Sequence, residues 1–194
     1  YRAGTMTAVL SKESSLKEGE EHIVKTDAPE RPLELPCDVH HIKVKGASYF
    51  VLVGLLHDDP YEVFAGKNGF IDKKVKSGII IRKKRPKGMY KAVLEDDSEI
   101  SPINATCSEE EDALTRMTST SLRHGADIHH VVQQLEKVKG DMTSFAKSMA
   151  RALKKYIPNG KKEQGECPEC NAQDALIRQE GCITCTQCGY SKCT

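Results

Sequence analysis

The crowding of cysteines at the carboxyl end is the feature that most constrains this chain. Six of its eight cysteines lie within the last 28 of 194 residues; they are Cys167, Cys170, Cys182, Cys185, Cys188 and Cys193. A secreted scaffold distributes its cysteines through the domain that its disulfides staple, and no signal-peptide pattern precedes Tyr1. The clustering therefore predicts a metal site or a redox site in a soluble, cytoplasmic protein.

Two C-x-x-C pairs in this tail have the spacing of a zinc ribbon. Cys167 and Cys170 form the first pair, Cys185 and Cys188 form the second, and fourteen residues separate them. Two thiolates three residues apart grip one side of a tetrahedral zinc ion, and a short hairpin brings the second pair to the other side. A tail of about 30 residues buries little core, so we expect zinc to supply its folding energy.

Four zinc ligands leave two cysteines over, and two assignments stay open. In the first, both C-x-x-C pairs bind zinc while Cys182 and Cys193 are spare; Gly189, directly after Cys188, suits the turn of a knuckle and favours this assignment. In the second, Cys182 replaces Cys188 as a ligand, and Cys188 and Cys193 are spare. Spare thiols near a chain end favour disulfide exchange, and the alternative is that they are inert or bind further metal.

The rest of the chain divides by composition and periodicity. Residues 1–12 alternate as a strand does, and the proline-containing residues 13–36 have the composition of a linker. Five candidate strands follow, at 40–46, 48–56, 61–66, 78–85 and 89–95. From about 108 to 157 the apolar period becomes 3.6, which predicts three helices. We therefore expect an α+β domain over 37–158, with an antiparallel sheet of four to five strands and three helices, before a zinc-ribbon-like tail over 159–194.

The first of these helices has a clear starting signal. Ser108 and Glu111 form a capping-box pattern, in which each side chain accepts a hydrogen bond from the backbone of the other. The apolar spacing after it predicts which residues line the buried face of this helix, namely Leu114, Met117, Ser121 and Leu122.

Charge is segregated along the chain although the net charge is only +1. Residues 73–91 contain nine Lys or Arg and no acid, whereas residues 95–112 contain eight acids and no base. The two stretches form either solvated faces that attract each other or, for the basic one, a contact for a phosphate-bearing ligand or a neighbouring subunit. No apolar run approaches the roughly 18 residues of a membrane span.

Three stretches stand in order along the chain: YFVLVGLLHDDPYEVFAGKNG, then LTRMTSTSLRHGADIHHVVQQLEKVKGDMTSFAKSMARALKKYIPNG, then GCITCTQCGYSKC. Together they resemble the C-terminal portion of adenosylcobalamin-dependent (class II) ribonucleotide reductases. The resemblance covers most of residues 30–193, and YRAGTMTAVLS at the start resembles the end of that family's catalytic barrel. None of the family's radical or substrate-binding motifs matches a segment of these residues.

The resemblance implies the C-terminal part, or a split subunit, of an enzyme that reduces ribonucleotides to deoxyribonucleotides by radical chemistry. Adenosylcobalamin would then belong to a catalytic barrel partner, and we expect an oligomer with no membrane or nucleic-acid partner. By the same resemblance, Cys182 and Cys193, or alternatively Cys188 and Cys193, relay electrons from an external thiol reductant to the active-site disulfide of the barrel. The stretch Gly160–Glu166 is expected to be a flexible link that gives the tail its reach.

A second hypothesis comes from a different functional class. A zinc-ribbon adaptor that binds nucleic acid or protein would use the same fold without catalysis, but it needs four cysteines and not six. Neither Cys37 nor Cys107 matches a family motif, and we expect both to be structural. The adjacent pairs His40–His41 and His129–His130 are poor bidentate metal ligands, because neighbours on a strand or a helix point in different directions.

Overall fold

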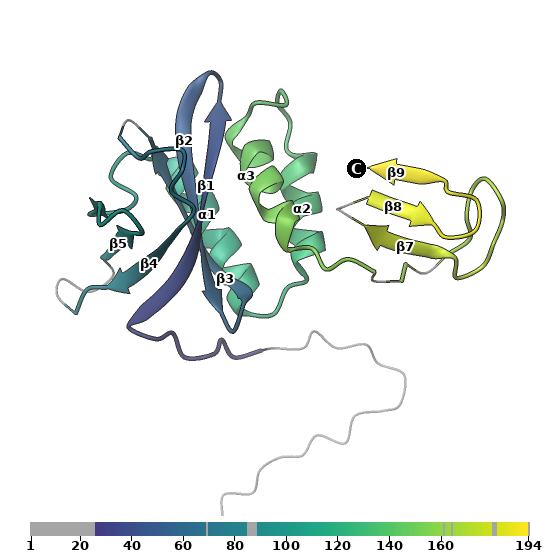
Figure 1. Ribbon diagram of the computed structural model, residues 1–194, viewed down its shortest axis with the longest axis horizontal. Helices are drawn as coiled ribbons and strands as arrows, with labels where there is room; N and C mark the ends of the chain where they lie inside the picture. Colours follow the sequence, from purple (N-terminus) through teal and green to yellow (C-terminus); the bar gives the residue numbers. More distant parts are fainter. Residues whose placement is uncertain are drawn as a thin grey trace, which may run out of the picture.

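A computed structural model describes residues 26–68, 70–84, 89–160, 162–163, 165–179 and 182–193, so the strand expected within residues 1–12 lies outside it. The elements in chain order are β1 (Glu34–Val44), β2 (Ala47–Leu56), β3 (Asp59–Lys67), β4 (Ser77–Arg82), β5 (Tyr90–Leu94), β6 (Glu99–Ile100), α1 (Glu109–Arg123), α2 (Ile128–Lys137), α3 (Phe145–Leu153), the 3-10 helix η1 (Lys154–Tyr156), β7 (Leu176–Gln179), β8 (Cys182–Cys185) and β9 (Ser191–Cys193). They form an α+β domain followed by a small three-stranded sheet (Figure 1). Among the described helices, none has the length and apolar character that a membrane crossing requires.

The large sheet is antiparallel, with the strand order β3-β2-β1-β4-β5-β6. The five strands expected from the sequence are confirmed as β1 to β5, and β6, whose two residues are too few to show a period, adds a sixth. The β1–β2 hairpin turns at Lys45 and Gly46, whose φ angles of 48° and 87° suit a two-residue type I′ turn. β1 begins at Glu34, inside the stretch 13–36 that the sequence suggested as a linker.

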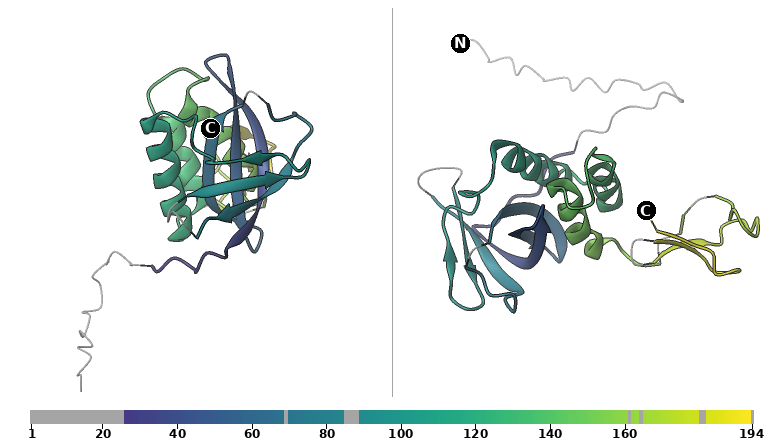
Figure 2. Two further views of the ribbon diagram at one scale, coloured as in Figure 1. Left: turned by 90° about the vertical axis from the view of Figure 1, so that its left-hand side faces the viewer. Right: turned by 90° about the horizontal axis from the view of Figure 1, so that it is seen from above.

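Strand β2 is buried on both faces, and this organises the domain into two cores. Val51 and Val53 pack with the helices, whereas Phe50 and Leu52 pack in a second cluster with residues of β1, β4 and β5. The helices cover one side of the sheet, and β4 and β5 run at a steep angle to β2 on the other side (Figure 2). A strand covered on both faces has a continuous apolar sequence, as residues 48–56 do.

The free edge of the sheet at β3 is covered by side chains from α1 and the segment before it. The Ser119 hydroxyl accepts the N–H of Val63 at 2.8 Å. The Cys107 thiol donates to the carbonyl of Ala65 at 3.0 Å. These bonds satisfy backbone groups that an edge strand would otherwise present to another chain.

This packing shifts the buried face of α1 from the one expected. The capping box of Ser108 and Glu111 is confirmed, and of the expected face Leu122 is buried and Leu114 packs against the helical core, whereas Met117 is 64% exposed. The other buried residues of the helix are Thr115, Thr118 and Ser119. Small hydroxyl residues let the helix lie close to the backbone of β3, so hydrogen bonding and close approach, and not apolar spacing, determine which face turns inward.

A buried carboxylate joins the segment before β1, the sheet and α1. The side chain of Glu62 on β3 is fully buried and accepts hydrogen bonds from Arg31 Nη2 and Arg123 Nη2, both at 2.6 Å. Arg31 Nη2 also donates to the carbonyl of Ile80 on β4 at 3.2 Å. Gly54 lies opposite Glu62 and makes room for it, since a Cβ there would come within 2.8 Å of Glu62 Cγ.

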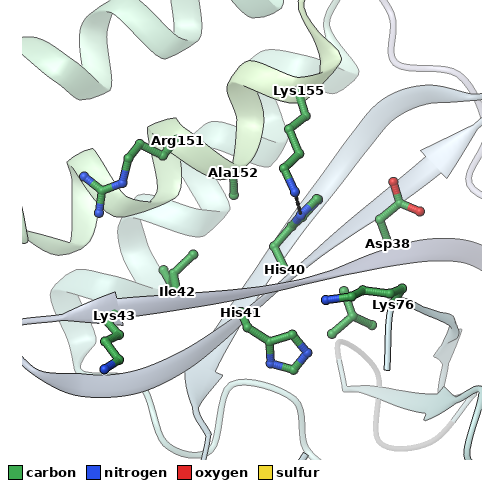
Figure 3. A pocket seen from close by; sticks show the side chains of 10 residues that line it. Asp38, His40, His41, Ile42, Lys43, Lys76, Arg151, Ala152 and Lys155 are labelled. Atoms are coloured by element: carbon green, nitrogen blue, oxygen red, sulfur yellow. Dashed lines mark hydrogen bonds between the residues drawn. The ribbon is translucent and has the colours of Figure 1, made fainter. Parts of the chain in front are cut away.

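A chain of hydrogen bonds fastens η1 to β1. Lys155 Nζ lies 3.4 Å from His40 Nδ1, as the dashed line in Figure 3 shows, and His40 Nε2 lies 2.7 Å from the hydroxyl of Tyr156. That hydroxyl donates to Asp38 at 2.6 Å. An ammonium group only donates, so His40 Nδ1 accepts and Nε2 carries the proton. Burial, and then the charge of Lys155, lower the pKa of His40 to about 4, which keeps the ring neutral.

We expect Glu62→Gln to destabilise the domain by about 3–5 kcal/mol, because it leaves two arginines beside an uncharged buried amide. Urea unfolding followed by circular dichroism measures the change. Glu99→Gln is the control, since that carboxylate is 48% exposed in its pair with Lys91 and contributes less than about 1 kcal/mol. Equal losses of unfolding free energy in the two variants would contradict a stabilising role for the ion pairs of Glu62 with Arg31 and Arg123.

We expect the stability of the domain to fall as pH falls from about 6.5 to about 4. Across this range the unfolded chain protonates His40 while the folded chain does not, so protonation favours unfolding, by at most about 3 kcal/mol. His40→Gln should flatten this part of the pH profile of unfolding free energy. The exposed His130→Gln should leave the slope unchanged, and a flat wild-type profile would contradict the prediction.

Candidate metal centre and redox cysteines

Two similar turns shape the C-x-x-C pairs of the tail. The N–H of Asn171 donates to the carbonyl of Cys167 at 2.8 Å, and the N–H of Gly189 donates to the carbonyl of Cys185 at 3.1 Å. Asn171 and Gly189 each follow the second cysteine of a pair, and both have a positive φ, of 54° and 76°. Asn and Gly adopt this conformation at low cost, which is the local reason why the chain forms knuckles here.

The four sulfurs of these pairs converge on one point. All four Sγ atoms lie within 4.8 Å of one another. The Sγ atoms of Cys167 and Cys188 are 3.7 Å apart, and so are those of Cys170 and Cys185. A tetrahedral centre with metal–sulfur bonds of about 2.3 Å has sulfur–sulfur edges of about 3.8 Å. The donor set therefore fits a tetrahedral metal ion such as zinc.

The surroundings of the sulfurs favour metal binding over thiol packing. Cys167 and Cys185 are buried with Ala175 and Leu176 in a cluster far smaller than either core of the α+β domain. The backbone N–H groups of Cys188 and Gln187 lower the pKa of the Cys185 thiol to about 6, whereas burial and the neighbouring sulfurs raise the pKa of the Cys170 and Cys188 thiols. So small a core gives little folding energy, and a bound ion would supply it.

Cys182 has a different state from the four converging cysteines. It lies in β8, where its Cα is paired in register with that of Cys193 in β9. Cys182 is disulfide-bonded, whereas Cys188 and the other three members of the cluster are free thiols. The structure thus brings together the first of the two ligand sets that the sequence left open, and it places Cys182 outside that set.

The segment before the ribbon is paired, which differs from the flexible link expected over Gly160–Glu166. Among its described residues, the N–H of Gly160 donates to the carbonyl of Arg178 at 2.6 Å, and the N–H of Glu163 donates to that of Leu176 at 2.9 Å. Glu166 forms a further bridge to Gln173. The described part of the link is therefore an extra strand-like edge of the small sheet, because its backbone groups find partners on β7.

Arg178 is a buried residue that the sequence did not identify. Its side chain is 1% exposed and forms an ion pair with Glu163. Burial and then the charge of Arg178 lower the pKa of His129 in α2. A single arginine in a short strand carries no sequence signal that separates it from a surface arginine.

The isolated cysteines have structural surroundings. Burial, with the negative charge of Asp38, raises the pKa of the Cys37 thiol to about 12. Burial and the charge of Glu111 do the same for Cys107, which donates to Ala65. Both thiols stay protonated, so their chemistry is that of small core residues.

The adjacent histidines point in different directions. His40 bonds to Tyr156 on the helical side, whereas His41 Nε2 lies 3.0 Å from the carbonyl of Val75. His129 is buried and its neighbour His130 is exposed. Strand geometry thus separates His40 from His41, whereas the rings of His129 and His130 lie in tilted contact with their centroids 5.5 Å apart.

Comparison with known proteins gives one match. Residues 35–158, well over half of the chain, match a family model described as the NrdJ homologue C-terminal domain. No curated protein and no solved structure matches the chain. The matched range takes in β1 to η1 and ends before the cysteine tail.

We expect Cys170→Ser to release the metal ion and unfold the ribbon, because three thiolates no longer close a tetrahedral site. A zinc-sensitive chromophore measures metal release, and amide exchange of β7 to β9 measures unfolding. Cys107→Ser is the matched control, since serine keeps the hydrogen bond to Ala65 and the site keeps four sulfurs. Full metal retention by Cys170→Ser would contradict the four-sulfur site.

Proposed function

The chain belongs to the family described as the NrdJ homologue C-terminal domain, and we propose on this basis that it is the C-terminal part or split subunit of an adenosylcobalamin-dependent ribonucleotide reductase. Membership relates it to the C-terminal portion of the class II ribonucleotide reductase NrdJ and supports an association with ribonucleotide reduction. In this proposal the chain performs no radical step. It passes reducing equivalents to a catalytic barrel partner.

The separation of the tail cysteines into two groups carries the proposal. Four sulfurs converge as a metal site, and Cys182 is oxidised outside it. Cys193 stands directly across from Cys182 in neighbouring strands, at the end of the described chain. A metal-held ribbon that carries a redox pair outside the metal site suits thiol–disulfide exchange.

The proposed exchange balances in two steps. In the reduced pair, one thiolate attacks a sulfur of the active-site disulfide, which forms a mixed disulfide and releases one barrel thiolate. The second tail thiol, as its thiolate, then attacks the tail sulfur of this mixed disulfide and releases the other barrel thiolate. Two electrons and two protons pass to the barrel, and the tail is left as a disulfide. An external dithiol reductant restores it by the same two steps.

The pairing of the link means that the ribbon moves as one unit. Ile157 packs in the helical core, and Gly160 is already bonded to Arg178 of β7. Only Pro158 and Asn159 lie between these two anchors. The reach of the redox pair then depends on how the α+β domain docks on its partner.

Two cofactors have separate places in this proposal. Zinc would be held by Cys167, Cys170, Cys185 and Cys188, where it would supply the folding energy of the ribbon and keep these sulfurs out of exchange. Adenosylcobalamin would supply the radical in the barrel partner, and no residue of this chain is assigned to it.

We expect Cys193→Ser to retain metal but to stop multiple turnovers of the catalytic partner driven by an external dithiol. A single turnover by the pre-reduced partner should persist, since the barrel thiols are already reduced. The measurement is deoxyribonucleotide formed per active site, with the metal content determined on the same sample. Cys107→Ser, which removes a half-buried thiol outside the tail, is the control and should turn over normally.

The opposite results would identify the alternatives. Loss of zinc from Cys193→Ser would show that Cys193 is a ligand and overturn the assignment of the relay pair. Undiminished turnover by that variant would overturn the relay. Metal release on oxidation of any tail thiol, with no stimulation of a reductase, is the behaviour expected of a zinc-ribbon adaptor.

A further inference from the structure

A cavity of about 600 Å³ lies between β1 and the end of the helical layer, and its described lining includes no residue of the cysteine tail. β4 is paired with β1 only from Glu34 to Asp38, and one further bond joins the N–H of Val39 to the carbonyl of Lys76 at 2.7 Å. Beyond this point the edge of β1 borders the cavity. The backbone N–H of His41 lies on the same edge as that of Val39, because alternate residues of a strand direct their backbone groups to the same side.

The walls of this cavity are strongly basic. Arg151 and Lys155 lie on the helical side, and Lys43 and Lys76 lie on the side of the sheet (Figure 3). Among the described residues that line it, Asp38 is the one acid. With His40 neutral, four cations and one anion leave a net charge of +3 (4 − 1) around the space.

These positive charges are not neutralised within the described part of the chain. None of the four cations forms an ion pair with a described residue. Asp38 accepts the hydroxyl of Tyr156. Glu95 accepts the backbone N–H of Lys76 and the hydroxyl of Ser77, and it is not part of the lining.

The fields of two of these lysines converge on the cavity floor. Burial and then the charge of Lys155 lower the pKa of His40, and Lys76 adds to this while the charge of Asp38 opposes it. A cleft lined by one sign of charge concentrates its potential and attracts counter-ions of the opposite sign. The ligand that such a space suits is a compact anion with several charges.

We propose that this basic cavity binds the di- or triphosphate group of a ligand, with Lys76 and Lys155 on its two walls as the principal contacts. A di- or triphosphate group carries several negative charges at neutral pH and offers many acceptor oxygens to ammonium and backbone N–H donors. The group could come from a nucleotide or from inorganic polyphosphate, and the recognition chemistry is the same. The proposal is independent of the relay, since it uses no tail cysteine.

The test is calorimetric titration of the full chain with sodium triphosphate at low ionic strength. We expect the double variant Lys76→Gln/Lys155→Gln to weaken binding by at least about tenfold. The matched control is Lys73→Gln/Lys74→Gln, which removes the same charge from exposed positions of the same basic stretch outside the cavity, and it should weaken binding less than about twofold. The ring resonances of His40 should shift on binding, and its pKa should rise as the anion offsets the two lysines.

Parallel titrations distinguish the possible sources of the phosphate group and reveal the results that would overturn the proposal. Tighter binding of ATP than of triphosphate assigns the site to nucleotides, equal binding assigns it to the phosphate group alone, and both support the proposal. Equal losses in the two double variants would show a diffuse basic surface and overturn it, as would no binding of triphosphate. A single-stranded oligonucleotide that displaces triphosphate, with an affinity that both double variants weaken equally, would assign the surface to nucleic acid. That result would also overturn the proposal.

Discussion

The requirement to cover both faces of β2 governs the architecture of the α+β domain. Val51 and Val53 on one face, and Phe50 and Leu52 on the other, are all excluded from water. One face is covered by three helices and the other by the twisted half of the sheet that β4 and β5 form. The buried hydrogen bonds and ion pairs of the domain follow from this arrangement. Two cores and an edge strand leave backbone and charged groups away from water, and these groups need partners.

The partners are provided by residues far apart in the chain. Ser119 and Cys107 satisfy the edge of β3, and Arg31 and Arg123 compensate Glu62 where water has no access. A buried carboxylate held by two arginines is costly to break but adds less net stability than its bond count suggests. The clearest consequence of these two ion pairs is geometric, since they tie the segment before β1 and the end of α1 to the same point of the sheet.

The ribbon is organised by a different force. Its small cluster around Cys167 and Cys185 does not resemble a domain core, and the converging sulfurs take the place of one. Pairing of the preceding segment with β7, and the ion pair of the buried Arg178 with Glu163, tie the described part of the link to the small sheet. The four converging sulfurs and Cys182 thereby lie on one small sheet, on which the proposed relay depends.

Local patterns in the sequence were sufficient for the strands β1 to β5, the capping box at Ser108 and the two knuckles, because each depends on residues within a few positions of one another. Tertiary structure alone decided the inward face of α1, the ion pairs of Glu62, the basic cavity beside His40 and the choice of Cys188 over Cys182 as a member of the four-sulfur cluster. Each of these joins groups from separate elements whose meeting depends on strand order and helix packing. Spacing along the chain determines local geometry, but the partners of a buried charge are known only when the elements have been placed in space.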